Sequence, residues 1–229
     1  MELTLNPEMK INKLSIGTEK APLLVIDNFI NQADELVNLA SQCNFVKNSP
    51  FYPGIRAEAP QRYQTLLIDD FKDTLIEFFQ LQREQLSLQI CHYSLVTTPA
   101  KELKLLQRIP HFDSLDKAGL ASVHYLFKKN LGGTSFYRHK KTQFEYIDEN
   151  RKLDYFRSLE SENGTGNIPA SGYINGDTAL FEKIAQQDGV FNRIIFYRRN
   201  SLHSGSISEH FIPDNNPRTG RLSINSFID

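Results

Sequence analysis

The sequence predicts a mainly β protein, a β-sandwich or jelly roll with helices packed on one face. Two segments with helical spacing of apolar residues come first, before about residue 81. From about residue 86 the chain consists of short β-rich runs separated by turn-forming residues. The composition can fill a large core, because 40% of the 229 residues are hydrophobic and 16 are Phe. No repeat, low-complexity tract or linker appears, so we expect one domain over residues 1–229.

The N-terminal third is expected to contain one strand and two helices. The apolar run 22–30 is rich in β-formers and reads as a strand. Asn31 follows as the expected N-cap of a helix over 32–43, where apolar residues recur at helical spacing. A second helix is predicted over 63–81, because its large apolar residues fall on one face.

From about residue 86 the chain is expected to form strands joined by loops, with one polar helical insert at 144–164. The Pro- and Gly-rich stretch 48–63 is predicted to be an ordered loop, and Gly132-Gly133 marks a turn. Further strands are predicted over 86–97, 119–127, 131–139, 191–205 and 220–227.

Charge and cysteine usage exclude several functional classes. The net charge is −1, with 26 basic and 27 acidic residues, which gives no electrostatic footprint for nucleic acid. No long apolar run or signal-peptide layout is present, so we expect a cytoplasmic protein that does not bind membranes. The two cysteines, Cys43 and Cys91, are too few for a disulfide framework, and burial as small apolar residues is expected for both.

The segment "PHFD" contains the first candidate metal ligands, His111 and Asp113. Alternate side chains of an extended segment point to the same side, so this imidazole and carboxylate can reach one ion. A third candidate, His203, follows an apolar β-rich run about ninety residues later. Arg221 then lies eighteen residues beyond His203, at the start of the last predicted strand.

In this order, H-x-D, H and R-x-S resemble the motifs of the Fe(II)- and 2-oxoglutarate-dependent oxygenases. "VIDNFI" before a helix is similar to the N-terminal entry of their prolyl-hydroxylase-like members. "VHYLF", "GGTSFY", "NRIIFYRRNSLHSG" and "GRLSINSF" follow the order of that family's core strands. "QRIPHFD", "GGTSFYRH" and "GRLSINSF" also resemble a bacterial group of uncharacterised relatives of these oxygenases. The resemblance covers the chain from about residue 21 and implies a double-stranded β-helix, the cupin-like jelly roll.

The resemblance also implies the cofactors. His111, Asp113 and His203 would hold Fe(II) as a facial triad, a donor set that leaves coordination positions open. Arg221 and Ser223, two residues apart on one strand, would bind the far carboxylate of the cosubstrate 2-oxoglutarate, with the Tyr125 hydroxyl as a further candidate. The reaction implied is hydroxylation of a substrate with release of succinate and CO2. Because Asp113 occupies the carboxylate position, halogenation is not expected.

Some alternatives remain open at this stage. The spacing between His203 and Arg221 exceeds the roughly ten residues commoner in the family, which makes Arg218 a second candidate for the cosubstrate carboxylate. The chain could also be a non-catalytic jelly-roll binding module, or a cupin-like metal enzyme that does not use 2-oxoglutarate. Its substrate could be a small molecule, an amino acid or a peptide, and a homodimer is the default assembly. Tyr52, Arg56 and Arg62 are candidates for the substrate pocket.

Other histidines and arginines are expected to have structural roles. His92 and His124 lie within predicted strands and lack a spaced acidic partner. Arg138 and His139 are expected at a solvated strand end, and His210 in an exposed loop. Arg193, Arg198 and Arg199 are predicted to be surface charges, and Tyr137 is expected either to line the barrel or to pack in the core.

Overall fold

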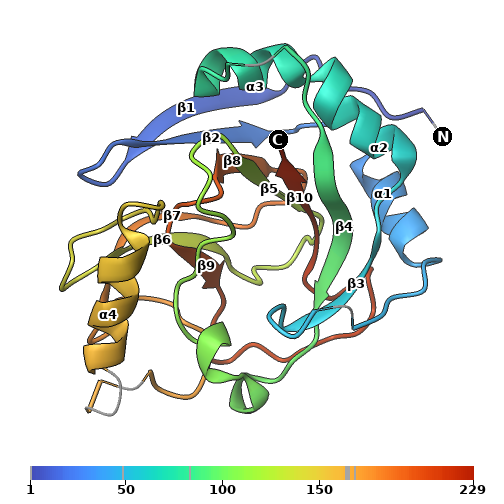
Figure 1. The fold of residues 1–229 in the computed structure, drawn as a ribbon. Helices are drawn as coiled ribbons and strands as arrows, with labels where there is room; N and C mark the ends of the chain where they lie inside the picture. Colours follow the sequence, from blue (N-terminus) through green and yellow to red (C-terminus); the bar gives the residue numbers. More distant parts are fainter. Residues whose placement is uncertain (1, 48, 83, 163–165, 168) are drawn as a thin grey trace.

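Two antiparallel sheets form the framework of the protein (Figure 1). The structure is a computed structural model that describes residues 2–47, 49–82, 84–162, 166–167 and 169–229. The seven-stranded sheet has the order β1-β2-β8-β5-β10-β4-β3, and the three-stranded sheet has the order β7-β6-β9. The strands of the large sheet are β1 (Lys10–Ile16), β2 (Ala21–Asp27), β3 (Gly54–Glu58), β4 (Leu88–Val96), β5 (Leu120–Tyr125), β8 (Ile194–Arg198) and β10 (Leu222–Ile228). Those of the small sheet are β6 (Gly133–His139), β7 (Phe181–Gln187) and β9 (His203–Ser206).

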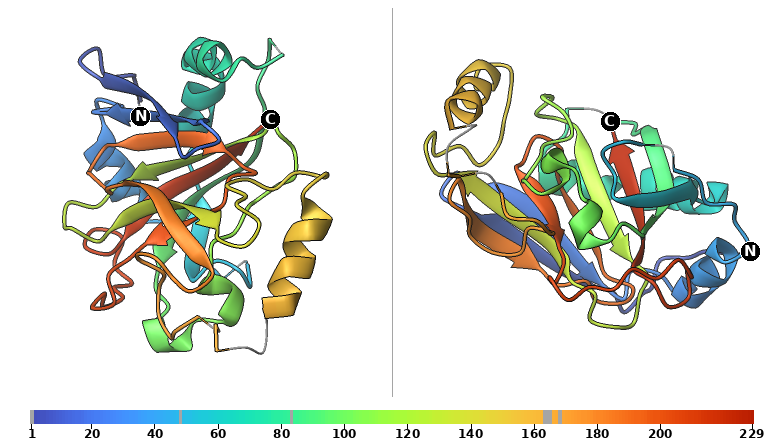
Figure 2. Two further views of the ribbon diagram at one scale, coloured as in Figure 1. Left: turned by 90° about the vertical axis from the view of Figure 1, so that its left-hand side faces the viewer. Right: turned by 90° about the horizontal axis from the view of Figure 1, so that it is seen from below.

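The two faces of the large sheet pack against different partners. Successive side chains of a strand point to opposite faces, and β2 shows this directly. Leu24 and Ile26 belong to the core between the sheet and the N-terminal helices. Leu23 and Val25 belong to a second core on the other face, which includes Phe136 of the small sheet. The layers are therefore helices, large sheet and small sheet, as Figure 2 shows. This mainly β jelly-roll arrangement is the predicted fold class.

The predicted helices form, with changes at their ends. α1 spans Ala33–Ala40, and its N-cap is Gln32 without a side-chain cap. The predicted N-cap, Asn31, is wrong, because its amide instead donates to Thr4 Oγ1 at 2.9 Å and ties the helix start to the N-terminal segment. The expected helix over 63–81 is interrupted, as α2 (Gln61–Thr65) passes through a π-helical turn (Leu66–Asp70) into α3 (Lys72–Phe79). Its apolar face still packs on the large sheet.

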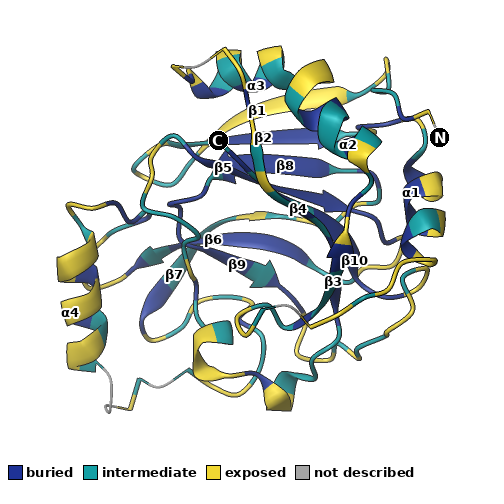
Figure 3. Cartoon of the chain, turned by 45° about the vertical axis from the view of Figure 1, so that its right-hand side comes forward, coloured by how far each residue is buried: buried dark blue, intermediate teal, exposed yellow. Residues whose placement is uncertain are grey.

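One predicted strand is divided, and three observed strands, among them β7 of the small sheet, were not predicted as strands. The run 191–205 is two strands, because a turn at 199–202 carries the chain from β8 in the large sheet to β9 in the small one. The stretch predicted as a loop contains β3, an edge strand. β1, the other edge strand of the large sheet, was not predicted; its residues are almost all exposed and include Lys10 and Lys13 (Figure 3). Such charged edges discourage pairing with other chains, and they also lack an apolar pattern.

Arg138 and His139 were expected at a solvated strand end, but His139 is fully buried and Arg138 is half-buried. Arg138 donates to Glu145 at 2.5 Å, and Glu145 also accepts bonds from the Thr18 N–H and hydroxyl in the β1–β2 turn. Burial raises the pKa of Glu145, but the hydrogen bonds to its carboxylate outweigh this and hold the pKa below its ordinary value. His139 bonds Glu162 at 3.1 Å and so fastens helix α4 (Lys152–Glu162) to the small sheet. Segments distant in the sequence cover both residues, which local patterning cannot show.

The other structural assignments have mixed outcomes. Cys91 is buried as predicted, whereas Cys43 is exposed beyond the end of α1. His124 is a buried strand histidine, bonded to the Tyr63 hydroxyl and to Asn192, as expected. Arg199 is not a surface charge, because it is 4% exposed and forms an ion pair with Asp229. In the described part of the chain, no helix combines the length and apolarity needed to cross a bilayer.

Candidate metal centre and its cavity

His111 and His203 lie side by side because their backbones pair. Each N–H donates to the other's carbonyl at 2.9 Å, which forms an isolated antiparallel bridge next to β9. The centroids of the two imidazole rings are consequently 4.4 Å apart. Two residues further, the Asp113 N–H donates to the Arg199 carbonyl at 2.8 Å, which fixes the carboxylate on the same side. The sequence predicted this grouping of three, and the structure brings the three residues together.

The three side chains are placed as a ligand set. His111 Nε2 is 3.6 Å from Asp113 Oδ1, and His203 Nε2 is 3.4 Å from Asp113 Oδ2. All three ligand atoms lie within 4.8 Å of one another. With metal–ligand bonds of about 2.1 Å at right angles, neighbouring ligand atoms lie about 3.0 Å apart. The two His–Asp separations exceed this by about 0.4 and 0.6 Å, and the three ligand atoms would close further around one side of a divalent ion, so the residues fit a metal.

Protonation favours the same reading. His203 Nδ1 lies 3.0 Å from the Ser201 carbonyl, to which it donates, so Nε2, on the side of Asp113, is the nitrogen available to bind a metal. Burial, followed by the neighbouring His203, lowers the pKa of His111 to about 4, although Asp113 opposes this shift. The His111 side chain is 53% exposed, but it lines the cavity described next. Neutral imidazole is the form that binds a metal.

A cavity of about 640 Å³ opens beside the three residues. Its volume lies within the range of about 300–1,000 Å³ typical of small-molecule sites. One wall is the inner face of the large sheet, where residues at every second position of β10 line the cavity. These residues are Ser223, Asn225 and Phe227, and Arg221, just before the strand, continues the same alternation. The metal ligands and the cavity therefore form one site.

Arg221 is a buried cation without an acidic partner. It is 5% exposed, and it donates from Nε to the Leu131 carbonyl at 3.0 Å and from Nη2 to the Gly133 carbonyl at 2.8 Å. No described residue accepts a hydrogen bond from Nη1, and no described carboxylate forms an ion pair with Arg221. Burial lowers the pKa of Arg221, yet a guanidinium stays protonated in proteins. Burying an unpaired charge is costly, so an anion from outside the chain is the expected partner.

The turn that receives Arg221 depends on glycine. Gly132 has φ +84°, and a Cβ there would lie 1.9 Å from the Ser206 carbonyl oxygen. A side chain at this position is therefore excluded both by conformation and by space. The predicted turn at Gly132-Gly133 thus presents the two carbonyls that orient the guanidinium.

The other residues predicted to bind the cosubstrate differ in their position relative to the cavity. Ser223 lines the cavity, but its hydroxyl bonds Asn225 Oδ1 at 2.7 Å. Tyr125 is fully buried behind the cavity wall, where its hydroxyl donates to Thr134 Oγ1 at 2.7 Å. Arg218 lies outside the cavity and caps the end of α1 through Asn38 and Ser41. Of the two arginine candidates, the structure places only Arg221 in the site.

The opposite wall comes from segments that the sequence left largely unassigned. Helix α4 and the segment around His111 contribute Ile109, Phe112, Tyr155, Phe156 and Leu159. Positions 155, 156 and 159 follow helical spacing within the polar insert, and this pattern could have indicated a wall. Tyr173, also not singled out, lines the cavity and donates its hydroxyl to the Thr98 carbonyl at 2.7 Å. Tyr52 and Arg56 line the cavity, whereas Arg62 points elsewhere and pairs with Asp70 at 2.7 Å.

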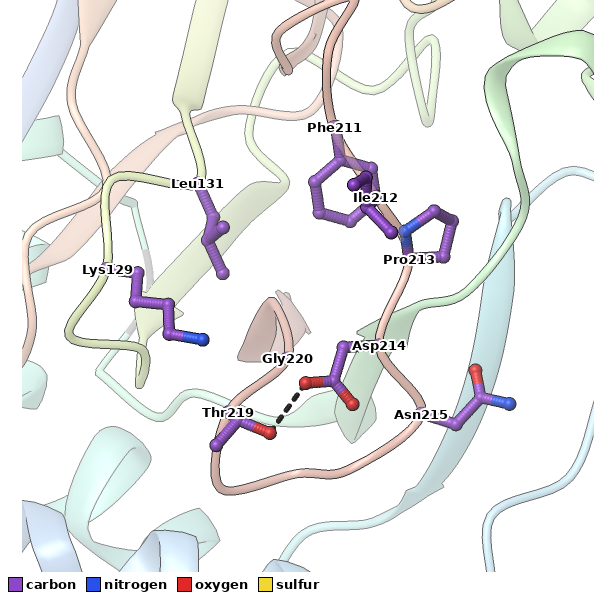
Figure 4. Close-up of a pocket in the computed structure, with 9 residues that line it drawn as sticks. All are labelled: Lys129, Leu131, Phe211, Ile212, Pro213, Asp214, Asn215, Thr219 and Gly220. Atoms are coloured by element: carbon purple, nitrogen blue, oxygen red, sulfur yellow. Dashed lines mark hydrogen bonds between the residues drawn. The ribbon is translucent and has the colours of Figure 1, made fainter.

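A second cavity, of about 490 Å³, lies beneath the loop after β9 (Figure 4). It is lined by Lys129, Leu131 and residues 211–215 with Thr219 and Gly220, and Asp214 there is satisfied by Thr219 at 2.6 Å. It contains none of the three candidate ligands. This loop accounts for the long spacing between His203 and Arg221, because it folds away from the site.

Comparisons with known proteins agree with this fold. The model of a family of unknown function, DUF6445, matches residues 7–228. The structure is similar to the non-heme alpha ketoglutarate dependent epimerase SnoN from nogalamycin biosynthesis, with a TM-score of 0.55 and 12% identity over 92% of this chain and 79% of that one. It is also similar to HygX from Streptomyces hygroscopicus, solved with nickel, 2-oxoglutarate and hygromycin B bound, with a TM-score of 0.51 and 10% identity over 92% of this chain and 83% of that one. No curated protein matches the sequence. At these identities the likeness shows the jelly-roll fold of 2-oxoglutarate-dependent enzymes and not the activity.

Proposed function

We propose that this chain, which belongs to the family of unknown function DUF6445, is an Fe(II)- and 2-oxoglutarate-dependent oxygenase. The proposal rests on two features that lie in one cavity, a set of metal ligands and an unpaired positive charge. A His–Asp–His ligand set and an uncompensated, buried guanidinium line the same space. A metal alone would explain the first feature, but only a bound anion explains the second.

Each protein group has a distinct role in this proposal. His111, Asp113 and His203 would hold Fe(II), with two neutral imidazoles and one carboxylate on one side of the ion. Arg221 would hold the far carboxylate of 2-oxoglutarate through its free Nη1 and its charge. Bound Fe(II) would supply oxygen activation, so that a substrate C–H, O2 and 2-oxoglutarate give C–OH, succinate and CO2. The carboxylate of Asp113 would take a coordination position that a halide would otherwise need, which favours hydroxylation.

The neighbouring groups prepare the site for these roles. The Ser201 carbonyl fixes the His203 tautomer, and the backbone bridge fixes the spacing of the two rings. The carbonyls of Leu131 and Gly133 fix the orientation of Arg221 before any anion arrives. Helix α4 covers the opposite side of the cavity and limits access of water to it.

The direct test is anaerobic addition of Fe(II) and then 2-oxoglutarate to the purified protein. We expect a visible metal-to-ligand charge-transfer band that requires both additions, and slow release of succinate when air is admitted. Failure to bind a divalent metal would favour the non-catalytic jelly-roll module. Metal binding without any response to 2-oxoglutarate would favour a cupin-like metal enzyme of another kind.

A further inference from the structure

A second guanidinium, that of Arg56, lines the same cavity. Arg56 lies on β3 opposite Ser94 of β4, which in turn lies opposite Ser223 of β10. The three residues form a row across neighbouring strands, and Arg56 and Ser223 both line the cavity. The Arg56 guanidinium stacks on the Tyr52 ring, 4.2 Å from its centroid. This stacking occupies a face of the guanidinium and leaves its hydrogen-bonding edge available.

Arg56 also lacks an acidic partner of its own. Its Nε is buried and makes no hydrogen bond to any described residue, and no described carboxylate forms an ion pair with it. The carboxylate whose charge reaches it is that of Asp113, which a bound metal would take. Among the described residues that line the cavity, Asp113 is the one acid.

The charges in the loaded site do not balance without a further anion. A divalent metal and two guanidiniums are positive, whereas Asp113 and the 2-oxoglutarate dianion are negative, and the imidazole ligands are neutral. One positive charge is left over. Because Arg221 is already assigned to the cosubstrate, the excess charge belongs to Arg56. A monoanionic group on the substrate would neutralise it in a site of low dielectric.

The rest of the space beside Arg56 is apolar. The facing wall consists of aliphatic and aromatic side chains from the segment before His111 and from α4. Apolar side chains continue to the mouth of the cavity, where Phe51 and Leu106 are 69% and 60% exposed. An apolar lining with one directed charge is typical of a site for an amphipathic small molecule. A single planar fork suits a carboxylate, which accepts two parallel hydrogen bonds.

We propose that Arg56 binds the carboxylate of the substrate, and that this substrate is a small monocarboxylate with an apolar or aromatic body. The inference rests on the proposed function and deepens it, because it assigns the two arginines of the cavity to two different carboxylates. Tyr52 is a positioning residue that holds the guanidinium against the cavity wall.

The test uses the full chain loaded anaerobically with Fe(II) and 2-oxoglutarate. The probes are 3-phenylpropionate and its neutral analogue 3-phenylpropionamide, with Kd measured by calorimetry. We expect the unmodified protein to bind the carboxylate about tenfold or more tightly than the amide. Arg56→Gln is expected to remove this preference, whereas Arg56→Lys should retain part of it. Arg62→Gln, outside the cavity, is the matched control and should retain it fully.

A second readout separates the two carboxylate sites. In Arg56→Gln the Kd of 2-oxoglutarate, followed by the charge-transfer band, should stay within about threefold of the unmodified protein. A rise in that Kd comparable with the effect of Arg221→Gln would overturn the inference and assign Arg56 to the cosubstrate. Equal binding of acid and amide by the unmodified protein would overturn it as well. Absence of the band altogether would instead refute the proposed function on which it rests.

Discussion

The sharpest prediction concerns replacement of Arg221 by glutamine. We expect Arg221→Gln to weaken binding of 2-oxoglutarate without preventing metal binding. In the structure the Arg221 side chain already gives Nε and Nη2 to two backbone carbonyls, so Nη1 and the positive charge remain for a ligand. Glutamine keeps a polar group near these carbonyls but removes both the charge and the fork.

The magnitude follows from the buried setting. A hydrogen bond to a charged group contributes about 1.5–3 kcal/mol, and at 5% exposure Arg221 has little water to replace its partner. We therefore expect a loss of about 3 kcal/mol, which raises the Kd of 2-oxoglutarate about 100-fold. The assay is anaerobic titration of the Fe(II)-loaded protein, followed by the charge-transfer band. A thermal melt checks the fold, where a change of 1 kcal/mol shifts the Tm by about 2–4 °C for a protein of this size.

Arg218→Gln provides the control, since Arg218 bonds Asn38 and Ser41 at the end of α1 and lies outside the cavity. This variant should bind 2-oxoglutarate like the unmodified protein. The reasoning is refuted if Arg221→Gln, folded and metal-loaded, keeps a Kd within threefold of the original. An effect of Arg218→Gln larger than that of Arg221→Gln would reverse the assignment.

Three further predictions address the metal, the acid stability and the thiols. His203→Ala should weaken Mn(II) binding at least 100-fold, measured by electron paramagnetic resonance, because a ligand is lost. The control His210→Ala changes an exposed histidine and should leave Mn(II) binding unchanged. Equal binding by the two variants would exclude the triad. Glu145→Gln should lower the free energy of unfolding in urea by about 3 kcal/mol at pH 7, because a buried ion pair is broken. The pKa of Glu145 is lowered in the folded protein, so its contribution to the free energy of unfolding is complete above its ordinary pKa near 4.5 and is lost as the pH falls through the folded pKa. If Glu145→Gln loses stability with acid as steeply as the unmodified protein does, this reasoning is contradicted. In the native protein a thiol reagent should modify exposed Cys43 alone and should react with Cys91 only in denaturant, because burial raises the pKa of Cys91 to about 12. Rapid reaction of both thiols in the native protein would show that Cys91 is accessible.

Strands that are buried on both faces were predictable from the sequence, and the exposed edge strand β1 was not. The β-rich runs at β2, β4, β5 and β10 alternate or cluster apolar residues, because both faces of the large sheet are covered there. β1 has no such covering and hence no signal, so it was missed. Glu145 shows the same limit for charges, because besides nearby Arg138 it bonds Thr18 in the β1–β2 turn, 127 positions away in the sequence. The identity of a polar residue does not indicate which distant segment will bury it.

The sequence by itself determined the chemistry available to the site, since the identity and order of His111, Asp113, His203 and Arg221 limit what can be bound there. The tertiary structure decided the distances. It split the run 191–205 between two sheets, which placed His203 against His111, and it folded the following loop outward so that Arg221 faces the cavity. It also placed Arg56, one of the three candidates for the substrate pocket, and the wall of α4 beside the metal ligands. The physical reason is that side-chain alternation and propensity act over a few residues, whereas a binding site is assembled by packing between segments far apart in the chain.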